Sequence, residues 1–200
     1  MKVLKNIRGS IILVFTMVVL VSILYPYVTV VITQFMYPNN SNVPIIYHNG
    51  TAVASPYMAE NFTEPWFFHP RPSLSDYSEL SNNGSGQYGA LSSNLYNFTS
   101  MMVYIYYSNL TKYIKNNTIN IPLNVSLNVV SYSSSNEDPG ISLLAALIQI
   151  PRISYYSKIP QNILLDMVQN NTVYPQYGIF GIAYINIVPL NIDIYYKTQM

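Results

Sequence analysis

The sequence contains no cysteine, which excludes a disulfide scaffold and any metal site built on thiolates. Charge is also scarce, because only 8% of the 200 residues are Asp, Glu, Lys or Arg and the formal net charge is +1. A chain with so small an excess of one sign lacks the basic surface with which proteins bind nucleic acid. Apolar and aromatic residues are abundant instead: 50% of the chain is hydrophobic and 20 residues are tyrosine.

One long stretch near the N-terminus has no charge at all. Lys2, Lys5 and Arg8 open the chain, and the next Asp, Glu, Lys or Arg is Glu60. Within this gap the residues from 11 to 35 are almost wholly apolar, and a helix of that length measures roughly 37 Å, enough to cross a bilayer. A cleaved signal peptide would have a shorter apolar region and a small-residue cleavage site, which does not follow here. The sequence therefore predicts a retained transmembrane helix over residues 11–36.

The basic residues also predict the orientation of this helix. Because Lys and Arg favour the cytoplasmic side of a membrane, residues 1–10 are expected in the cytoplasm and the rest of the chain outside the cell membrane. Residues 37–44 are rich in Asn and Pro and are expected to form a linker. Residues 45–200 are then expected to form one extracytoplasmic domain.

Periodicity and turn signals predict both helices and strands in this domain. The expected elements are a hairpin over 45–55 that turns at Asn49-Gly50, a long loop over 56–92, an amphipathic helix over 93–116 with its stripe towards a core, a strand over 121–130, a helix over 142–150 interrupted by Pro151, a helix over 161–169, and a strand within 183–194 that ends at Pro189 before a short terminal element. The mixture predicts an α+β fold, with one N-terminal transmembrane helix followed by a small mixed α/β domain.

Motifs that would indicate an enzyme are missing from the sequence. It has no G-x-x-x-x-G-K phosphate loop, no H-E-x-x-H and no G-x-S-x-G. The two histidines, His48 and His69, lie far apart in the chain, and no further nitrogen or sulfur ligand accompanies them. We therefore expect no catalytic residue, no metal site and no cofactor bound by this chain.

The stretch WFFHPRPS, residues 66–73, places a histidine and an arginine each before a proline. Pro70 and Pro72 push the residues before them into extended geometry, so His69 and Arg71 are expected on a stiff backbone. Such a segment loses little entropy when it meets a partner. Two interpretations stay open: Arg71 contacts a partner protein, or it bonds to carbonyl groups of its own domain.

Four motifs occur in a fixed order along the chain. YPYVTVVITQFMYP ends the apolar stretch, ENFTEPWFFHPRPS contains the His-Pro-Arg-Pro segment, and DPGISLLAALIQIPRI and INIVPLN follow. Together they resemble the C subunit family of the Kdp potassium-transporting ATPase over nearly the whole chain. The resemblance marks as family-motif or partner-interface candidates Tyr25, Pro26, Thr29, Gln34, Phe62, His69, Pro70, Arg71, Pro72, Ser73, Asp138, Gln149, Pro151, Arg152, Asn186 and Asn191.

The resemblance implies a non-catalytic subunit of an ATP-driven potassium uptake complex. Such a subunit supports assembly and acts as a catalytic chaperone that raises the ATP affinity of the hydrolysing subunit. The implied partners are a channel-like potassium-binding subunit and a P-type ATPase subunit, besides membrane lipid, and the complex handles ATP and potassium. Four residues depart from the family pattern: Glu60, Gln87, Gly140 and Pro189.

Two other classes of protein remain as alternatives. A pilin-like or surface-layer structural protein with a single membrane anchor would also have a basic N-terminus, one apolar helix and a head rich in Asn, Ser and Thr. An extracytoplasmic enzyme is the third hypothesis, and the missing catalytic motifs argue against it.

Overall fold

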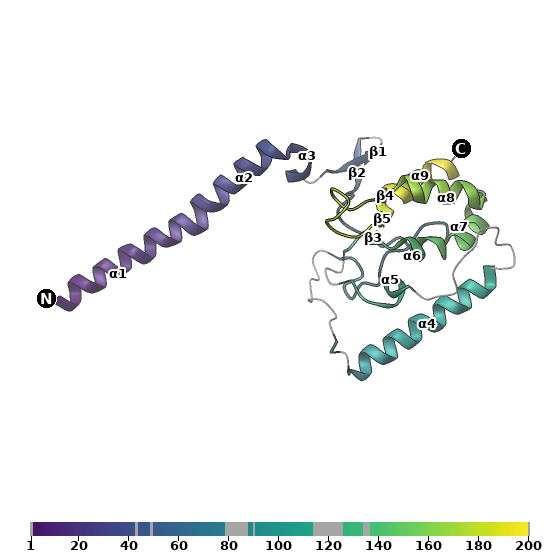
Figure 1. Cartoon of the computed structure of the whole chain (residues 1–200), viewed down its shortest axis with the longest axis horizontal. Helices are drawn as coiled ribbons and strands as arrows, with labels where there is room; N and C mark the ends of the chain where they lie inside the picture. Colours follow the sequence, from purple (N-terminus) through teal and green to yellow (C-terminus); the bar gives the residue numbers. More distant parts are fainter. Residues whose placement is uncertain are drawn as a thin grey trace. The chain divides into compact units, whose positions relative to one another are not determined.

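The computed structural model describes residues 2–42, 44–48, 50–78, 88–89, 91–113, 126–133 and 137–199. The chain divides into two compact units, an N-terminal helical unit, Met1–Pro44, and a second unit, Ile45–Met200, hereafter the domain. The domain contains both helices and strands, which confirms the predicted α+β class (Figure 1).

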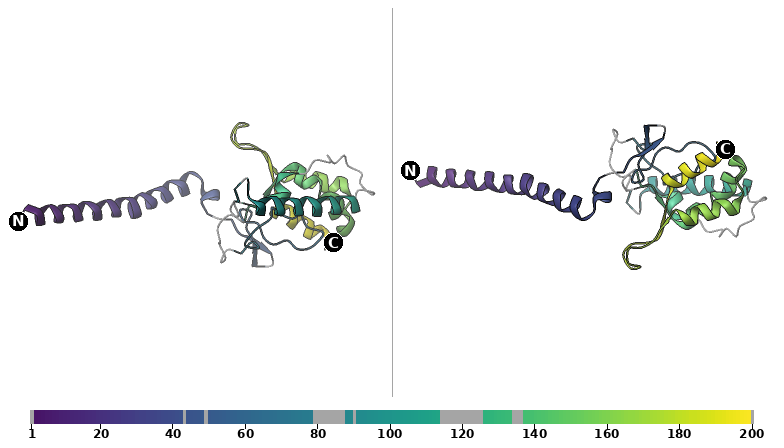
Figure 2. Two further views of the ribbon diagram at one scale, coloured as in Figure 1. Left: turned by 90° about the horizontal axis from the view of Figure 1, so that it is seen from below. Right: turned by 90° about the horizontal axis from the view of Figure 1, so that it is seen from above.

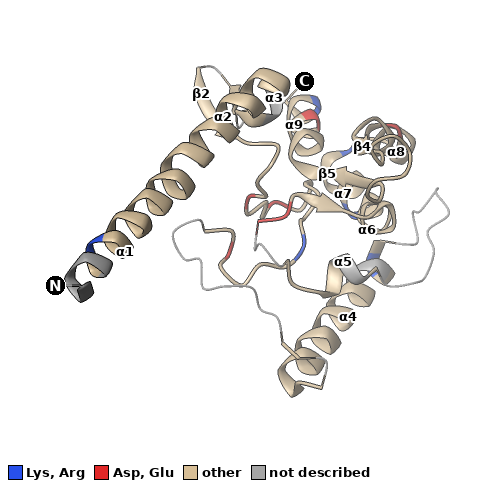
Figure 3. Ribbon diagram, turned by 60° about the vertical axis from the view of Figure 1, so that its left-hand side comes forward, with Lys and Arg blue, Asp and Glu red and all other residues tan. Residues whose placement is uncertain are grey.

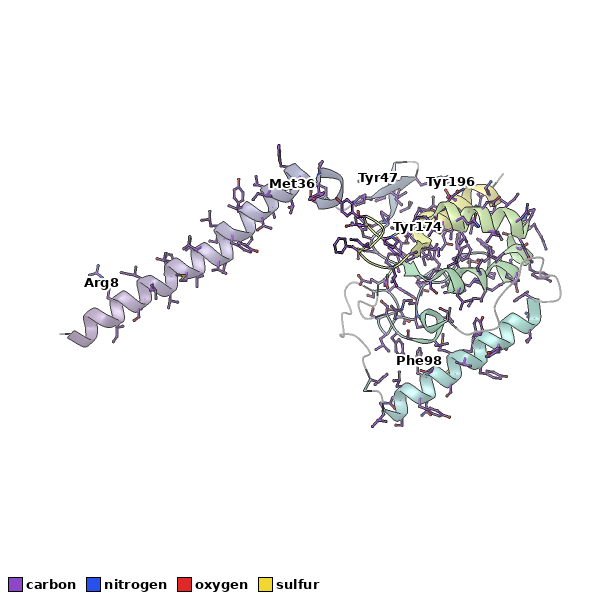
Figure 4. The ribbon with its side chains drawn as sticks, viewed as in Figure 1. Arg8, Met36, Tyr47, Phe98, Tyr174 and Tyr196 are labelled. Atoms are coloured by element: carbon purple, nitrogen blue, oxygen red, sulfur yellow. The ribbon has the colours of Figure 1, made fainter. Side chains whose placement is uncertain are left out.

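The N-terminal unit is a long helix built from α1 (Lys2–Val19), the π-helical turn η1 (Leu20–Leu24) and α2 (Tyr25–Met36). Its part Ile7–Met36, 30 residues long, is the one helix in the described chain that is long and apolar enough to cross a membrane. Figure 3 shows a single basic segment on this helix, near its N-terminal end, and Figure 4 labels Arg8 there. A four-residue helix, α3 (Pro38–Ser41), forms part of the predicted linker.

The π turn lies directly before Pro26, which has no backbone N–H. In this turn the Tyr25 N–H donates to the Leu20 carbonyl, five residues back rather than four. The Thr29 hydroxyl donates to the Tyr25 carbonyl over 2.8 Å, and the Thr33 hydroxyl to the Thr29 carbonyl over 2.9 Å. The helix thus accommodates the proline and pairs these hydroxyls internally, as a hydrocarbon environment requires.

The domain opens with the predicted hairpin. β1 (Ile46–His48) and β2 (Thr51–Ala54) pair antiparallel, and Gly50 between them has a φ of 80°, which glycine adopts without strain. His48, expected to flank the turn, ends β1, and its Nδ1 lies 3.0 Å from the Tyr196 hydroxyl. The described residues between 56 and 92 contain no regular helix or strand, as predicted.

A three-stranded antiparallel sheet and four helices make the core. The strands β3 (Gly140–Ile141), β5 (Tyr184–Asn186) and β4 (Thr172–Val173) lie in this order. The helices are α6 (Leu143–Leu147), α7 (Ile150–Ser157), α8 (Gln161–Asn170) and α9 (Ile187–Thr198). They bury Ile141, Ala145, Ile150, Ile153, Leu164, Val168, Ile185, Ile187, Leu190 and Ile194, joined by Phe68 from the long loop. Each fully buried Ile or Leu contributes about 2 kcal/mol.

The end of the chain differs from the prediction. The strand predicted to reach Pro189 stops at Asn186, and α9 begins at Ile187. The Asn186 side chain caps this helix by accepting from the Val188 N–H over 3.1 Å. Pro189 lies in the first turn, where a backbone N–H has no partner within the helix, so the proline is tolerated there.

Two further predictions were wrong in their bounds or type. Residues 127–130, predicted as part of a strand, form the short helix α5 (Leu127–Val130), and residues 121–125 lie outside the described chain. The helix predicted over 142–150 ends at Leu147, where a separate helix, α7, soon follows. Pro151 stands in the first turn of α7 and therefore starts a helix that the sequence did not predict.

The predicted amphipathic helix is present as α4 (Ser93–Tyr113), and its expected last residues lie beyond the described part. Its apolar stripe is half-buried, because no residue of α4 with a described environment is fully buried. Phe98, which is labelled in Figure 4, stacks on Tyr132 with ring centroids 3.8 Å apart. The stripe therefore covers the domain from outside instead of entering its main core.

Candidate functional site

The first turn of α7 holds the motif loop, defined here as residues 62–73. The Arg152 guanidinium donates to the carbonyls of Pro65 and Phe67, the latter over 3.0 Å, and to the Gln149 side-chain oxygen over 2.8 Å. Burial lowers the pKa of Arg152 to about 10, so the guanidinium is charged at neutral pH. A part-buried cation is thus balanced by two loop carbonyls and the Gln149 side-chain oxygen.

Gln149 pairs with both backbone groups of His69. Its Oε1 accepts from the His69 N–H over 2.8 Å, and its Nε2 donates to the His69 carbonyl over 3.2 Å. Nε2 also donates to the Ala145 carbonyl over 3.1 Å. One side-chain amide therefore replaces the strand partner that this stretch of loop lacks.

Asn191 on α9 pairs with the preceding residue, Phe68, in the same way. Its Oδ1 accepts from the Phe68 N–H over 2.8 Å, and its Nδ2 donates to the Phe68 carbonyl over 2.9 Å. Asn191 is 1% exposed and Phe68 is fully buried. Because buried backbone groups must be paired, this amide allows a loop residue to enter the core.

His69 is half-buried, and its imidazole is neutral at neutral pH. Its Nε2 lies 3.2 Å from the Glu64 carbonyl, to which it donates. Burial, and secondly the charge of Arg152, lower the pKa of His69 from 6.5 to about 4. A neutral imidazole whose Nε2 proton binds a carbonyl is a structural group, and this pKa leaves it uncharged at neutral pH.

The pKa of His69 predicts a loss of stability in acid. Above pH 6.5 the imidazole is neutral in both states, whereas below it the unfolded chain binds a proton that the folded chain excludes down to about pH 4. Between these values we expect a His69→Gln variant to lose about 2 kcal/mol less unfolding free energy than the wild type. Urea unfolding of the full chain in detergent at several pH values measures this difference. Parallel pH profiles of the two proteins would contradict it.

Arg71 bonds to its own domain, as one of the two open interpretations held. Its Nη2 donates to the Tyr132 carbonyl over 2.8 Å and to the Ser131 hydroxyl over 3.2 Å, and its Nη1 lies 3.4 Å from Asp138 Oδ2. The other Asp138 oxygen accepts from the Gly140 N–H over 2.8 Å. The Arg71–Asp138 pair is partly open to solvent, so it contributes at most about 1 kcal/mol.

Ser73 and Tyr77 fold the end of the motif loop back on itself. The Ser73 hydroxyl accepts from the Tyr77 N–H over 3.1 Å, and the Tyr77 hydroxyl donates to the Arg71 carbonyl over 2.6 Å. Burial is the main cause that raises the pKa of Tyr77. The sequence offered no sign of Tyr77, because tyrosine is frequent throughout this chain.

A cavity of about 270 Å³ lies between the motif loop, α4 and the start of α7. Its walls are mainly apolar and include Pro70, Pro72 and Ile148, together with Tyr106 from α4. The Tyr106 hydroxyl is buried without a hydrogen-bond partner among the described residues. The His69, Gln149 and Arg152 side chains at the wall already bind loop backbone, so the cavity suits an apolar group better than a charged one.

The remaining predicted residues lie in different places. Asn186 donates to the Pro56 carbonyl over 2.6 Å, and the Phe62 ring lies 5.6 Å from the Phe67 ring, against the core. The four membrane-motif candidates all lie on α2, in the other unit: Tyr25, Pro26, Thr29 and Gln34. The structure thus brings together the motif loop, Asp138, the start of α7 and Asn191.

The four residues that depart from the family pattern lie in different structural environments. A Cβ atom at Gly140 would lie 3.0 Å from both Asp138 Oδ1 and the Tyr184 ring, so this close packing suits glycine. Pro189 lies in the first turn of α9, and Glu60 is exposed. Gln87 lies outside the described residues.

An apolar helix is joined to a small α+β domain, and the motif side chains of that domain bind its own backbone. These features define a membrane-associated protein with one candidate span among the described residues. Residues 7–195 match the family model described as KdpC, the K+-transporting ATPase c chain. The chain therefore belongs to the KdpC family, which confirms the resemblance seen in its motifs.

Relatives in several organisms share this likeness, and each is called potassium-transporting ATPase KdpC subunit. The protein of Thermoplasma acidophilum is 36% identical over 178 residues, which cover 85% of this chain and 82% of the relative. That of Bacillus thuringiensis subsp. konkukian is 29% identical over 95% of both chains. That of Clostridioides difficile is 25% identical over 96% of this chain and 97% of the relative.

Family membership makes this chain an accessory subunit of a potassium uptake complex, and the other Kdp subunits are its partners. The pilin-like alternative is not favoured, because the match extends through the helix and the domain together.

Proposed function

We propose that this chain is a non-catalytic subunit that supports assembly of the Kdp complex from the outer side of the membrane. The observation that carries the proposal is that the motif side chains bind groups of their own domain. Gln149, Arg152 and Asn191 bind the backbone of the motif loop, and Arg71 binds the segment that leads to β3. Side chains used in this way shape a surface and do not converge on a substrate.

The orientation follows from the charge at the N-terminus. Lys2, Lys5 and Arg8 precede the apolar helix, and basic residues favour the cytoplasmic side. The domain is then extracytoplasmic. Protease added outside sealed cells is expected to digest the domain, whereas it should leave a tag before Lys2 intact.

The partners implied by the resemblance are a channel-like potassium-binding subunit and a P-type ATPase subunit. We propose that α2 packs on the channel-like subunit and that the domain covers its outer mouth. Tyr25 and Gln34 on α2 are exposed and available for such packing. The Thr29 hydroxyl, in contrast, binds its own helix.

We also propose that this chain acts as a catalytic chaperone that raises the ATP affinity of the hydrolysing subunit. An extracytoplasmic domain does not meet cytoplasmic ATP, so an increase in ATP affinity would have to pass through contacts between subunits. Comparing the ATP concentration for half-maximal hydrolysis with and without this chain measures that role separately from assembly.

An Arg71→Ala variant tests the assembly role. We expect the tagged full-length variant to recover the other Kdp subunits in lower yield, because Ser131, Tyr132 and Asp138 lose their contacts with the guanidinium. Growth in low potassium should fall in parallel. Lys112→Ala, on the exposed last turn of α4, is the control and should recover its partners normally.

Stability of the same variant separates the two possible roles of Arg71. If unfolding free energy and partner recovery fall together, the residue acts through its own domain. If only recovery falls, Arg71 also touches a partner. Wild-type chain that never co-purifies with a potassium-channel-like protein and a P-type ATPase would overturn the proposed function itself.

A further inference from the structure

A loop of ten residues, Tyr174–Ala183, links β4 to β5 and projects away from the rest of the domain (Figure 2). We call it the apolar tip. Its large side chains point into solvent: Tyr177 is 92% exposed, Ile182 83%, Ile179 74%, Tyr174 70% and Phe180 65%. A soluble surface rarely gathers so many exposed large apolar side chains in one short segment.

Charge is absent from the apolar tip and from its neighbours in sequence. No Asp, Glu, Lys or Arg occurs between Asp166 and Asp193. Burial of the tip in an apolar medium would therefore desolvate no ionised side chain of its own, which is the costliest term in such a transfer.

The backbone of the tip is closed by its own hydrogen bonds. The Gln176 and Phe180 N–H groups each bond to the other residue's carbonyl over 3.0 Å. Within this closed turn the Gly178 N–H donates to the Pro175 carbonyl over 3.0 Å, and the Ile179 N–H to the Gln176 carbonyl over 3.2 Å. These four bonds pair part of the tip's backbone internally, which lowers the cost of contact with the apolar part of a bilayer.

The conformation of Tyr177 supports a role for its side chain. Its φ is 54°, a left-handed value that turns normally assign to Gly or Asn. Gly178 and Gly181 supply the other positive φ values of the tip, 77° and 96°. A tyrosine in such a position costs stability, and this cost is consistent with a side chain selected for what it contacts.

We infer that the apolar tip inserts into the membrane interface, an inference that rests on the proposed anchoring of the chain. Tyrosine is enriched at the boundary between headgroups and acyl chains, because its ring is apolar and its hydroxyl is polar. Ile179, Phe180 and Ile182 would reach the acyl region, with Tyr174 and Tyr177 at headgroup level.

Two observations favour lipid over a protein partner. Residues 37–44 tether the domain to the apolar helix, and eight residues span at most about 30 Å, so the domain meets the bilayer surface at high effective concentration. A stable protein interface, in contrast, takes about 800 Å² and 20–30 residues from each partner. A ten-residue tip is smaller than this.

Site-specific fluorescence in bilayers tests the inference. The chain has no cysteine, so Tyr177→Cys in the full-length protein accepts one environment-sensitive dye. Tyr96→Cys, on the 74% exposed residue of α4, is the matched control. In vesicles of equal parts phosphatidylcholine and phosphatidylglycerol, we expect the tip dye to shift to shorter wavelength and to be quenched by nitroxide-bearing lipids. The control dye should do neither.

A second substitution confirms the cause. Phe180→Asp, added to the Tyr177→Cys protein, places a charge in the tip and is expected to abolish the quenching while co-purification with the other Kdp subunits persists. A tip dye that is unquenched in vesicles, both with the chain alone and with the assembled complex, overturns the inference. A dye shielded from water only in the complex, without nitroxide quenching, shows docking on protein and also overturns it.

The same preparations separate this inference from the proposed function. Normal co-purification with an unquenched tip refutes only lipid insertion. Chain that fails to co-purify, or that is not retained in vesicles, refutes the proposed function and removes the basis of the tip's insertion with it.

Discussion

An Arg152→Met variant is expected to lose about 4 kcal/mol of unfolding free energy. Methionine keeps most of the apolar volume of the side chain but removes every donor. The carbonyls of Pro65 and Phe67 would then lose a charged donor in a part-buried position, and the Gln149 side-chain oxygen would keep only the His69 N–H. Each unpaired acceptor costs about 1–3 kcal/mol, although partial access to water reduces the sum.

Trp66 provides a direct readout of this change. It is the single tryptophan of the chain, it packs against the core, and it lies between the two residues whose carbonyls Arg152 holds. Urea unfolding followed by its fluorescence should give a lower midpoint, and the folded-state emission should shift to longer wavelength. Lys197→Met removes an exposed cation from α9 and should change stability by less than about 0.5 kcal/mol. Equal stability of the two variants would show that Arg152 does not hold the loop.

An Asn191→Ala variant is expected to lose about 3 kcal/mol. The substitution leaves both the N–H and the carbonyl of the buried Phe68 without their partner and opens a small cavity. Far-UV circular dichroism during denaturation of the full chain in detergent measures the loss. Asn162→Ala, at an exposed position on α8, is the control and should be close to wild type.

Asn191→Asp distinguishes lost hydrogen bonds from lost packing. A carboxylate has nearly the size of the amide, but it places a negative charge beside the Phe68 carbonyl and no longer donates to it. When the carboxyl group is protonated it again has one donor and one acceptor. The destabilisation relative to wild type should therefore shrink as the pH falls, whereas Asn191→Ala should show no such recovery. A pH-independent deficit in both variants would argue for packing alone.

The parts of the fold that the sequence predicted are those set by local patterns. The apolar helix, the hairpin around Gly50, α4 and α8 follow from hydrophobic periodicity and turn residues. Two of the mistakes arose where a proline was taken as the end of an element. Pro151 and Pro189 both stand in the first turn of a helix, and only the Asn186 cap, seen in the structure, explains why α9 can begin before Pro189.

The sequence predicted which residues belong to the candidate site, but it did not predict their hydrogen-bond partners. The resemblance pointed to Gln149, Arg152 and Asn191, yet no local pattern states what their side chains bind. Gln149 reaches a loop residue 80 positions away, and Asn191 reaches one 123 positions away. Contacts at such separations depend on the packed core, and local periodicity carries no information about them.

The π turn before Pro26 changes how the faces of the membrane helix must be counted. A turn closed by a bond between Tyr25 and Leu20 holds about one more residue than an α-helical turn, so side chains on its two sides align one position later than usual. Val18 and Pro26 are eight residues apart, yet they lie on the same face of the helix in the way that residues seven apart do in a regular α-helix. A neighbouring helix that packs along the whole span would follow a stripe that skips one residue, and deletion of one residue from Leu20–Leu24 would keep that stripe continuous.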